Sequence, residues 1–166
     1  MTPEQFERWG VRNELFAVLL MLPLCVAAVD DFPAVTSDEQ YCMAEAMYFE
    51  ARSDGWRGMV AVGVVIKNRV DDPRYPDTVC GVVRHGAERG DRLCQFSYFC
   101  DGKPETIGNR ELWQQAQLMT DAVLSSDGIS VNGVSDATHY HAMRVTPWWA
   151  ETLERRGCVG DHIFYR

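Results

Sequence analysis

The amino-acid sequence predicts an α+β fold that is mainly α, with a small β element. Helical patterning with helix-capping residues occurs at residues 37–52, 56–70 and 109–125. Residues 94–99 and 139–141 are short and rich in aromatic rings, which is more typical of strands. With 166 residues and a hydrophobic fraction of 46%, the chain is long and apolar enough for one packed core.

The first two helices are predicted from a capping box and an apolar run. Ser37 is a typical N-cap and Gln40 follows three residues later, so a helix is expected from here to about Arg52. Gly55 is expected to end it. Residues 56–70 are apolar almost throughout and would suit a buried strand or a buried helix. Their length and the basic residues at their end favour the helix.

Four further elements are expected in the rest of the chain. Thr78 caps a short helix, residues 94–99 form a strand or hairpin arm, and Asn109 caps an amphipathic helix that runs to about residue 125. A last helix is expected over residues 146–157, with a proline at its first position and a glycine at its end.

Residues 1–29 are predicted to be a signal peptide or signal anchor, and residues 30–166 the folded domain. Residues 15–29 carry no charge; they are short for a membrane span of about 20 residues but suit the apolar part of an export signal. The alternative is a buried N-terminal helix. Export would place the protein in the periplasm or cell envelope, or outside the cell, with membrane association through residues 15–29 if the signal is retained.

Charge and cysteine content narrow the function further. Lys and Arg number 16 against 24 Asp and Glu, a net charge of −8, which excludes a nucleic-acid-binding domain that relies on basic clusters. Six cysteines are typical of an oxidising compartment. Removal of the signal leaves five, which predicts two disulfides and one free thiol among Cys42, Cys80, Cys94, Cys100 and Cys158.

Two glutamates in the first helix have different expected environments. Glu50 shares a helical face with Met43 and Met47, near the C-terminal end of the helix. Desolvation and the helix dipole should both raise its pKa, as a general acid requires. The alternative is a buried structural glutamate. Glu45 lies on the opposite, polar face, where it is expected to be solvated and paired with Arg52.

The His-x-His stretch allows two interpretations. On a strand, His139 and His141 point to the same face, a spacing that zinc sites use, with His85 or His162 as a third ligand. The alternative is that both histidines form hydrogen bonds in a cleft rich in aromatic rings. The sequence contains no HExxH or similar pattern, which favours the second interpretation and predicts no metal and no cofactor.

Several stretches, taken together and in this order, resemble the cell wall hydrolase family typified by the spore cortex-lytic enzyme SleB. They are residues 44–52, 58–62, 68–70, 75–83, 94–97, 100–102, 137–142 and 162–165. The resemblance covers roughly residues 41–166. It implies a lysozyme-like fold of the lytic transglycosylase type, with residues 30–166 as a cell wall hydrolase catalytic domain that acts on peptidoglycan glycan strands.

The resemblance also implies roles for individual residues. Glu50 corresponds to the family's catalytic glutamate in its Tyr-x-Glu-Ala-Arg motif, in agreement with the helical-face argument. One departure is Ser53-Asp54, where the family has Gly-Glu. The substrate-binding residues are expected to be Tyr48, Gln95, Phe96, Ser97, His139, Tyr140 and His141.

The predicted function is cleavage of the β-1,4 bond between N-acetylmuramic acid and N-acetylglucosamine, by a monomeric lytic transglycosylase with Glu50 as general acid and base. One alternative is a zinc-dependent peptidoglycan amidase or endopeptidase that uses His139 and His141. The other is a non-catalytic envelope protein whose aromatic side chains bind glycan.

Overall fold

The computed structural model describes residues 38–87, 94–125, 131 and 133–166. The predicted signal segment, residues 1–29, and the predicted cap Ser37 lie outside these residues. Within the described part of the chain, no helix is long and apolar enough to cross a membrane.

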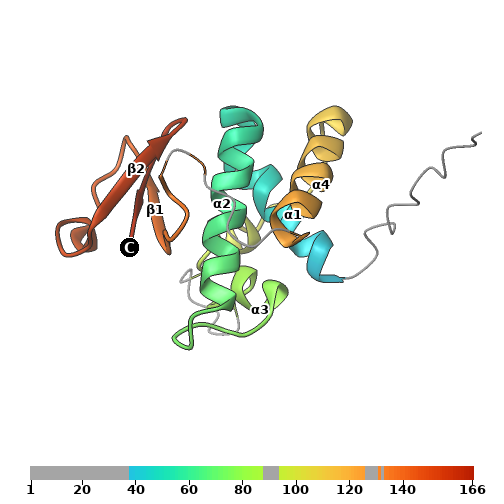
Figure 1. Ribbon diagram of the computed structural model, residues 1–166. Coiled ribbons are helices and arrows are strands. Elements are labelled where there is room, and N and C mark those ends of the chain that lie inside the picture. The colour runs from blue at the N-terminus through green and yellow to red at the C-terminus, as the bar shows by residue number, and fades with distance from the viewer. Residues whose placement is uncertain (1–37, 88–93, 126–130, 132) are drawn as a thin grey trace, which may run out of the picture. The chain divides into compact units, whose positions relative to one another are not determined.

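Helices make up most of the described chain (Figure 1). Helix α1 packs against the other three α-helices. Their bounds are α1 Asp38–Ala51, α2 Gly55–Val70, α3 Val79–Val83 and α4 Arg110–Ser125, and the short 3-10 helix η2 (Arg52–Asp54) joins the first two. Four of the five predicted helices are confirmed, three by α1, α2 and α4 and the short one by α3.

Local capping bonds explain where two of these helices begin. The hydroxyl of Thr78 accepts a hydrogen bond from the Gly81 amide at the start of α3. The side chain of Asn109 accepts one from the Leu112 amide at the start of α4. Both bonds satisfy amides that have no partner within the helix, and both caps were predicted from the sequence.

Helix α1 is covered on all sides, because residues 42–48 are buried without interruption. This corrects the expectation for Glu45, which was predicted to be solvated. The residue is 7% exposed, and the hydroxyl of Tyr98 donates to its carboxylate at 3.4 Å. Arg52 does not pair with it; the Arg52 guanidinium lies over the Tyr48 ring, 5.2 Å from the centroid.

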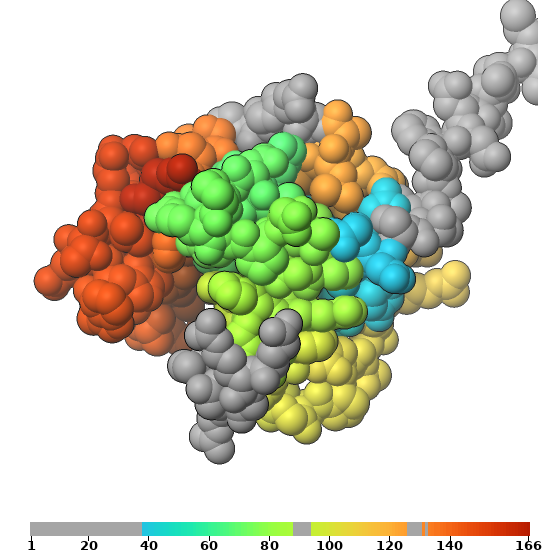
Figure 2. All heavy atoms as spheres, turned by 90° about the horizontal axis from the view of Figure 1, so that it is seen from below, coloured from blue at the N-terminus to red at the C-terminus, as the bar shows by residue number. Residues whose placement is uncertain are grey.

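The β element is a three-stranded antiparallel sheet of strand order β1-β3-β2, which lies beside α2 in Figure 1. Figure 2 shows the same arrangement on the surface. The green atoms, which belong to α2 and the residues after it, lie between the sheet and the start of α1. The strands are β1 His139–Ala142, β2 Arg155–Val159 and β3 His162–Tyr165. A fold that is mainly α with a small sheet was the sequence prediction, and it is confirmed.

Two predicted elements were wrong. Residues 94–99 do not form a strand: the 3-10 helix η4 (Ser97–Cys100) lies here, and the Cys94–Cys100 disulfide closes the segment into a tight loop. Residues 146–157 do not form a helix: they contain only the 3-10 helix η5 (Trp148–Glu151) before strand β2 begins. Pairing with β3 satisfies the backbone of β2 and outweighs its local helical signals.

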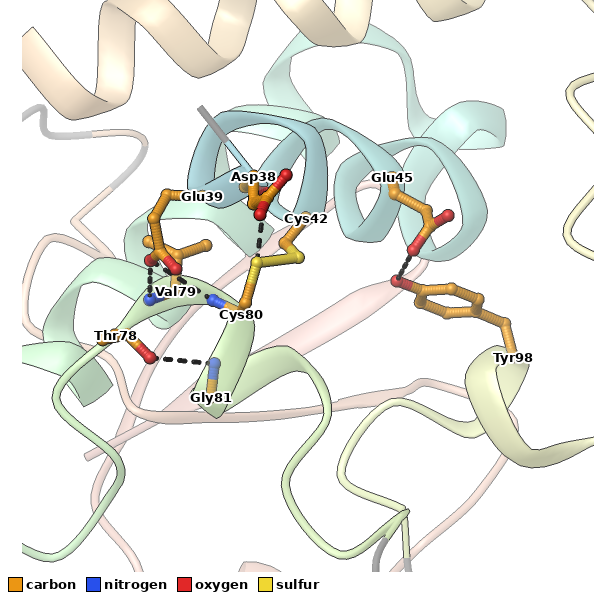
Figure 3. Close-up of a disulfide and its surroundings, with 9 residues drawn as sticks. All are labelled: Asp38, Glu39, Cys42, Glu45, Thr78, Val79, Cys80, Gly81 and Tyr98. Carbon is orange, nitrogen blue, oxygen red and sulfur yellow. Dashed lines mark hydrogen bonds between the residues drawn. A yellow bond between two sulfur atoms is a disulfide. The ribbon is translucent and has the colours of Figure 1, made fainter. Parts of the chain in front are cut away.

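Two disulfides join the described chain, and Cys158 is a free thiol, as predicted. Cys42 and Cys80 connect α1 to α3 (Figure 3). The carboxylate of Glu39 adds a second connection between these helices, because it accepts hydrogen bonds from the backbone amides of Val79 and Cys80. The start of α3 is therefore joined to α1 by a disulfide and by hydrogen bonds.

The two disulfides should differ in their effect on stability. Cys42→Ala/Cys80→Ala is expected to lower the free energy of unfolding by about 4 kcal/mol and Cys94→Ala/Cys100→Ala by about 2 kcal/mol, because the sequence separations are 38 and 6 residues. Denaturant unfolding measures both losses, with Cys158→Ala as the control. Equal losses for the two double variants would contradict this argument from loop length.

Candidate active site

A cavity of about 630 Å³ opens between the helices and the sheet. Its lining comes from the end of α1, the last turn of α2, the segment around η4, strand β1 with the loop that follows it, and the start of β3. The side chains that matter most for its chemistry are Glu50, Arg69, Gln95, Tyr140 and His162.

Glu50 lies in the last turn of α1 and faces this cavity. Its side chain is partly buried against the helical core, and this desolvation raises the pKa of its carboxyl group. The raised pKa agrees with the prediction from the helical face. Because the cavity still reaches the carboxyl group, Glu50 is a buried acid that a ligand can contact.

Three neighbours of Glu50 lower its pKa and so oppose the effect of desolvation. The Tyr140 hydroxyl donates a hydrogen bond to Oε2 of Glu50 at 3.1 Å, and the positive charges of His162 and Arg69 also lower the Glu50 pKa. Burial has the larger effect, so the pKa remains raised. Burial together with the Glu50 charge raises the pKa of Tyr140 as well, which keeps its hydroxyl a proton donor.

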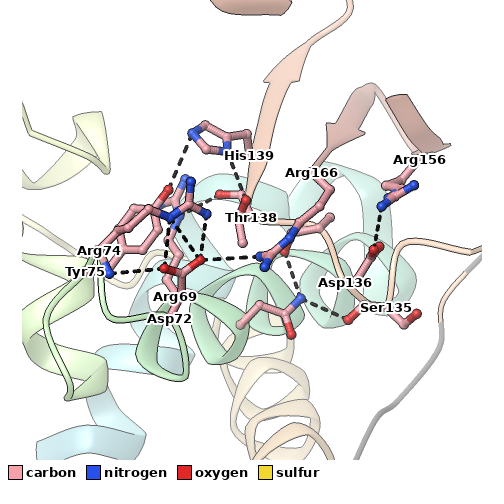
Figure 4. Close-up of polar contacts among 12 residues, drawn as sticks. Arg69, Asp72, Arg74, Tyr75, Ser135, Asp136, Thr138, His139, Arg156 and Arg166 are labelled. Atoms are coloured by element: carbon pink, nitrogen blue, oxygen red, sulfur yellow. Dashed lines mark hydrogen bonds and ion pairs between the residues drawn. The ribbon is translucent and has the colours of Figure 1, made fainter. Parts of the chain in front are cut away.

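Arg69 carries a fully buried guanidinium beneath the cavity, with 1% of the residue exposed. Its Nε donates to the Thr138 carbonyl at 2.7 Å (Figure 4). The guanidinium lies over the rings of Tyr75 and Phe96. With the amide oriented to satisfy both partners, the Gln95 oxygen accepts from Nη1 and Nη2 at 3.2 and 3.3 Å. Burial lowers the Arg69 pKa, yet a guanidinium remains charged in proteins.

Comparison with known proteins identifies the family. Residues 53–165 match the family model described as Cell Wall Hydrolase. The chain belongs to this family. Curated relatives of this chain are spore cortex-lytic enzymes. That of Oceanobacillus iheyensis is 51% identical over 124 residues, 74% of this chain and 39% of the relative. That of Bacillus subtilis is 44% identical over 128 residues, 74% and 35% of the two chains.

Solved structures support the same grouping. The catalytic domain of the germination-specific lytic transglycosylase SleB from Bacillus anthracis superposes with a TM-score of 0.61 at 29% identity, covering 81% of this chain and 99% of that one. The catalytic domain of the Bacillus cereus SleB protein gives 0.60 at 28% identity, covering 77% and 89%. The fold is therefore lysozyme-like, as the sequence resemblance implied. The chain spans 16% to 39% of the length of the first curated relatives.

The structure gathers five of the predicted site residues around one cavity. They come from three separate parts of the chain and are Glu50, Gln95, Ser97, Tyr140 and His141. Arg69 and His162 join them and were not predicted as site residues. Arg69 was interpreted only as a basic residue at a helix end. The signal that could have found it is its position four residues after Val65 and three after Ile66, on the apolar face of α2.

Three predicted substrate-binding residues lie elsewhere. Tyr48 and Phe96 are each 1% exposed and belong to the core. The Tyr48 hydroxyl accepts a hydrogen bond from the Asn109 amide at 3.0 Å, next to the start of α4, and Phe96 packs below the Arg69 guanidinium. His139 is partly buried among other aromatic rings and does not line the cavity. These aromatic side chains were expected in the cleft, but they lie elsewhere because large rings gain more from packing in the interior.

Both histidines of the His-x-His stretch are held by hydrogen bonds, as the second interpretation of this motif predicts. His139 contacts the Thr138 hydroxyl at 3.0 Å, and burial together with nearby arginines lowers its pKa to about 4, so the ring is neutral. His141 contacts the Tyr165 hydroxyl at 3.0 Å. Over the described ranges, no group of three His, Cys, Asp or Glu side chains is placed to hold a metal ion.

Replacing Tyr140 with phenylalanine is expected to raise the Glu50 pKa further, because the bond that stabilises the ionised carboxylate is lost while burial remains. Carboxyl-carbon NMR titration measures this, with the Glu50 signal assigned by its absence in Glu50→Gln. Tyr98→Phe is the matched control, because Tyr98 donates to Glu45: the Glu45 pKa should rise and that of Glu50 should not. An unchanged Glu50 pKa in folded Tyr140→Phe would contradict the prediction.

Proposed function

We propose that this chain degrades peptidoglycan by cutting the β-1,4 bond between N-acetylmuramic acid and N-acetylglucosamine, as a lytic transglycosylase. The observation that carries the proposal is the Glu50 carboxyl group: it lines an open cavity, its pKa is raised by burial, and Tyr140 orients it. Membership of the cell wall hydrolase family and the names of the relatives support the same substrate.

In the first step, protonated Glu50 gives its proton to the glycosidic oxygen while the bond from that oxygen to C1 of the muramic ring breaks. Positive charge then builds on the ring, as in other glycosidases. The raised pKa of Glu50 matters here because a carboxyl group that is already ionised has no proton to give.

In the second step, ionised Glu50 takes the proton from the 6-hydroxyl of the same muramic residue, and the 6-oxygen bonds to C1. The product carries a 1,6-anhydro ring, and Glu50 returns to its protonated form. The Tyr140 hydroxyl and the positive charges of Arg69 and His162 stabilise the carboxylate between the two steps. The site therefore favours protonated Glu50 before the reaction and stabilises ionised Glu50 between the two steps.

The contacts of Asp101, a second carboxylate of the cavity, support transglycosylation over hydrolysis. A hydrolase with two carboxylates needs the second one free to act as nucleophile or base. Of those that line the cavity in the described chain, Asp101 is bound to the Lys103 amide at 2.9 Å and to its ammonium group at 3.0 Å, which lowers its pKa. Asp161 is exposed in the turn between β2 and β3.

Peptidoglycan lies outside the cytoplasmic membrane, so we propose that residues 1–29 direct export and that residues 30–166 act in the envelope. The fifteen uncharged residues at 15–29 support this. The Cys42–Cys80 and Cys94–Cys100 disulfides also support it, because such bonds persist in oxidising compartments.

Glu50→Gln should abolish the clearing of purified sacculi while the protein stays folded, because the amide keeps the shape of the side chain but has no acidic proton. A loss of roughly 10²-fold or more is expected for removal of a general acid. Turbidity measures clearing, and circular dichroism measures folding. Glu111→Gln, an exposed carboxylate on α4, is the matched control. Retained clearing by Glu50→Gln would rule out the proposed role of Glu50.

Digested sacculi should yield muropeptides with 1,6-anhydro ends, identified by mass spectrometry as products lighter by one water than those with reducing ends. Reducing ends would indicate a hydrolase with the same bond specificity. New free amines, together with loss of activity on chelation, would select the zinc amidase alternative. Binding to sacculi without any soluble product would select the non-catalytic alternative.

A further inference from the structure

A carboxylate and an imidazole form a close pair at the edge of the cavity. Asp54 ends η2, four residues after Glu50, and its Oδ2 lies 2.7 Å from Nδ1 of His162, the first residue of β3. The two side chains are 3% and 12% exposed. Because an ionised carboxylate only accepts hydrogen bonds, Nδ1 of His162 is the donor in this contact.

The position of the Asp54 side chain is fixed by two glycines. A Cβ atom on Gly58 would lie 2.3 Å from Cβ of Asp54, and one on Gly160 would lie 2.2 Å from its Cγ. Oδ1 of Asp54 also accepts from the Asp161 amide at 3.3 Å. The carboxylate thus occupies a slot between α2 and the turn from β2 to β3, and it holds the His162 ring in one orientation.

His162 connects this slot to the acid. Its ring lies edge-on to the Tyr140 ring, with centroids 5.3 Å apart and planes at 77°. Tyr140 in turn donates its hydroxyl to Glu50 at 3.1 Å. His162, Tyr140 and Glu50 all line the same cavity. A continuous series of contacts therefore runs from Asp54 through His162 and Tyr140 to the carboxyl group of Glu50.

We propose that His162, oriented by Asp54, is a positioning residue of this site: it holds the Tyr140 ring so that the hydroxyl meets Glu50, and its imidazolium stabilises the Glu50 anion between the two chemical steps. The stabilisation of the Glu50 anion between the two steps rests on the proposed function. The positioning of the Tyr140 ring by His162 concerns only the folded protein. Neither residue was assigned this role by the sequence, where Asp54 was a departure from the family motif and His162 a candidate zinc ligand.

The charges around His162 agree with this role. Asp54 supplies a fixed counter-ion from η2, and Asp161 adds an exposed carboxylate from the turn. Glu50 faces it from α1 and Tyr140 from β1, while Arg69 in α2 is the second cation that acts on Glu50. A positive charge on His162 therefore has carboxylate neighbours, and it lowers the Glu50 pKa.

Two variants separate positioning from simple packing. His162→Asn retains an amide donor at the place of Nδ1, so the bond to Asp54 can still form, but it removes the ring and its charge. Asp54→Asn keeps the shape of the carboxylate and removes the counter-ion. His85→Asn and Asp71→Asn, both outside the cavity, are the matched controls. Thermal unfolding shows which variants fold; if Asp54→Asn does not, His162→Asn decides the test.

The first readout needs no substrate. Carboxyl-carbon NMR should show a higher Glu50 pKa in His162→Asn and Asp54→Asn than in the wild type, because both the imidazolium charge and the alignment of Tyr140 lower it. The controls should leave it unchanged. An unchanged Glu50 pKa in folded His162→Asn overturns the proposal, whatever the activity of the enzyme.

The second readout uses soluble glycan strands. Both variants should lose about tenfold in kcat with KM within about twofold of wild type, as expected for one lost stabilising interaction in the chemical step. Unchanged kcat, or a loss confined to KM, contradicts the role of His162. Inactive wild-type protein would contradict the proposed function instead, and the NMR titration would still test the positioning of Tyr140.

Discussion

The Arg69 guanidinium is the contact on which both the sheet and the cleft depend. It is fully buried at the end of α2, and it donates to the Thr138 carbonyl immediately before β1. The same group faces the Gln95 amide and acts on Glu50 through its charge. A buried cation needs partners for its N–H groups, because leaving them unpaired is costly. Those partners come from the segments that form the cleft, so this desolvated group joins the end of α2 to the start of the sheet.

The cleft balances two opposing effects on Glu50. Burial disfavours the ionised carboxyl group, while Tyr140 and the nearby cations favour it, and burial has the larger effect. A folded-state pKa above the ordinary value means that the native protein binds more protons than the unfolded chain. Stability therefore falls as pH rises from the ordinary glutamate pKa through the raised one. The acid is thus maintained at a cost to folding, which is typical of functional sites.

Sequence patterns were reliable where the physics is local. Caps at Thr78 and Asn109 marked helix starts because the capping bond joins residues three apart. Spacing along the first helix also placed Glu50 on the same face as Met43 and Met47, because helical periodicity is local. Residues 94–99 and 146–157 were assigned wrongly because a disulfide in one case and pairing with β3 in the other decide their conformation. Glu45 was misplaced because α1 is covered on all sides, which no single helical face reveals.

The sequence by itself determined the four α-helices, the number of disulfides, Glu50 as the candidate acid and, through its resemblance, the family. Each depends on spacing along the chain, which a sequence states directly. Only the tertiary structure decided which aromatic side chains fill the core and which line the cleft. It also revealed Arg69 beneath the site and His162 beside Asp54, 108 positions away in sequence. These arrangements depend on desolvation and on contacts between distant segments, and both exist only after the chain has folded.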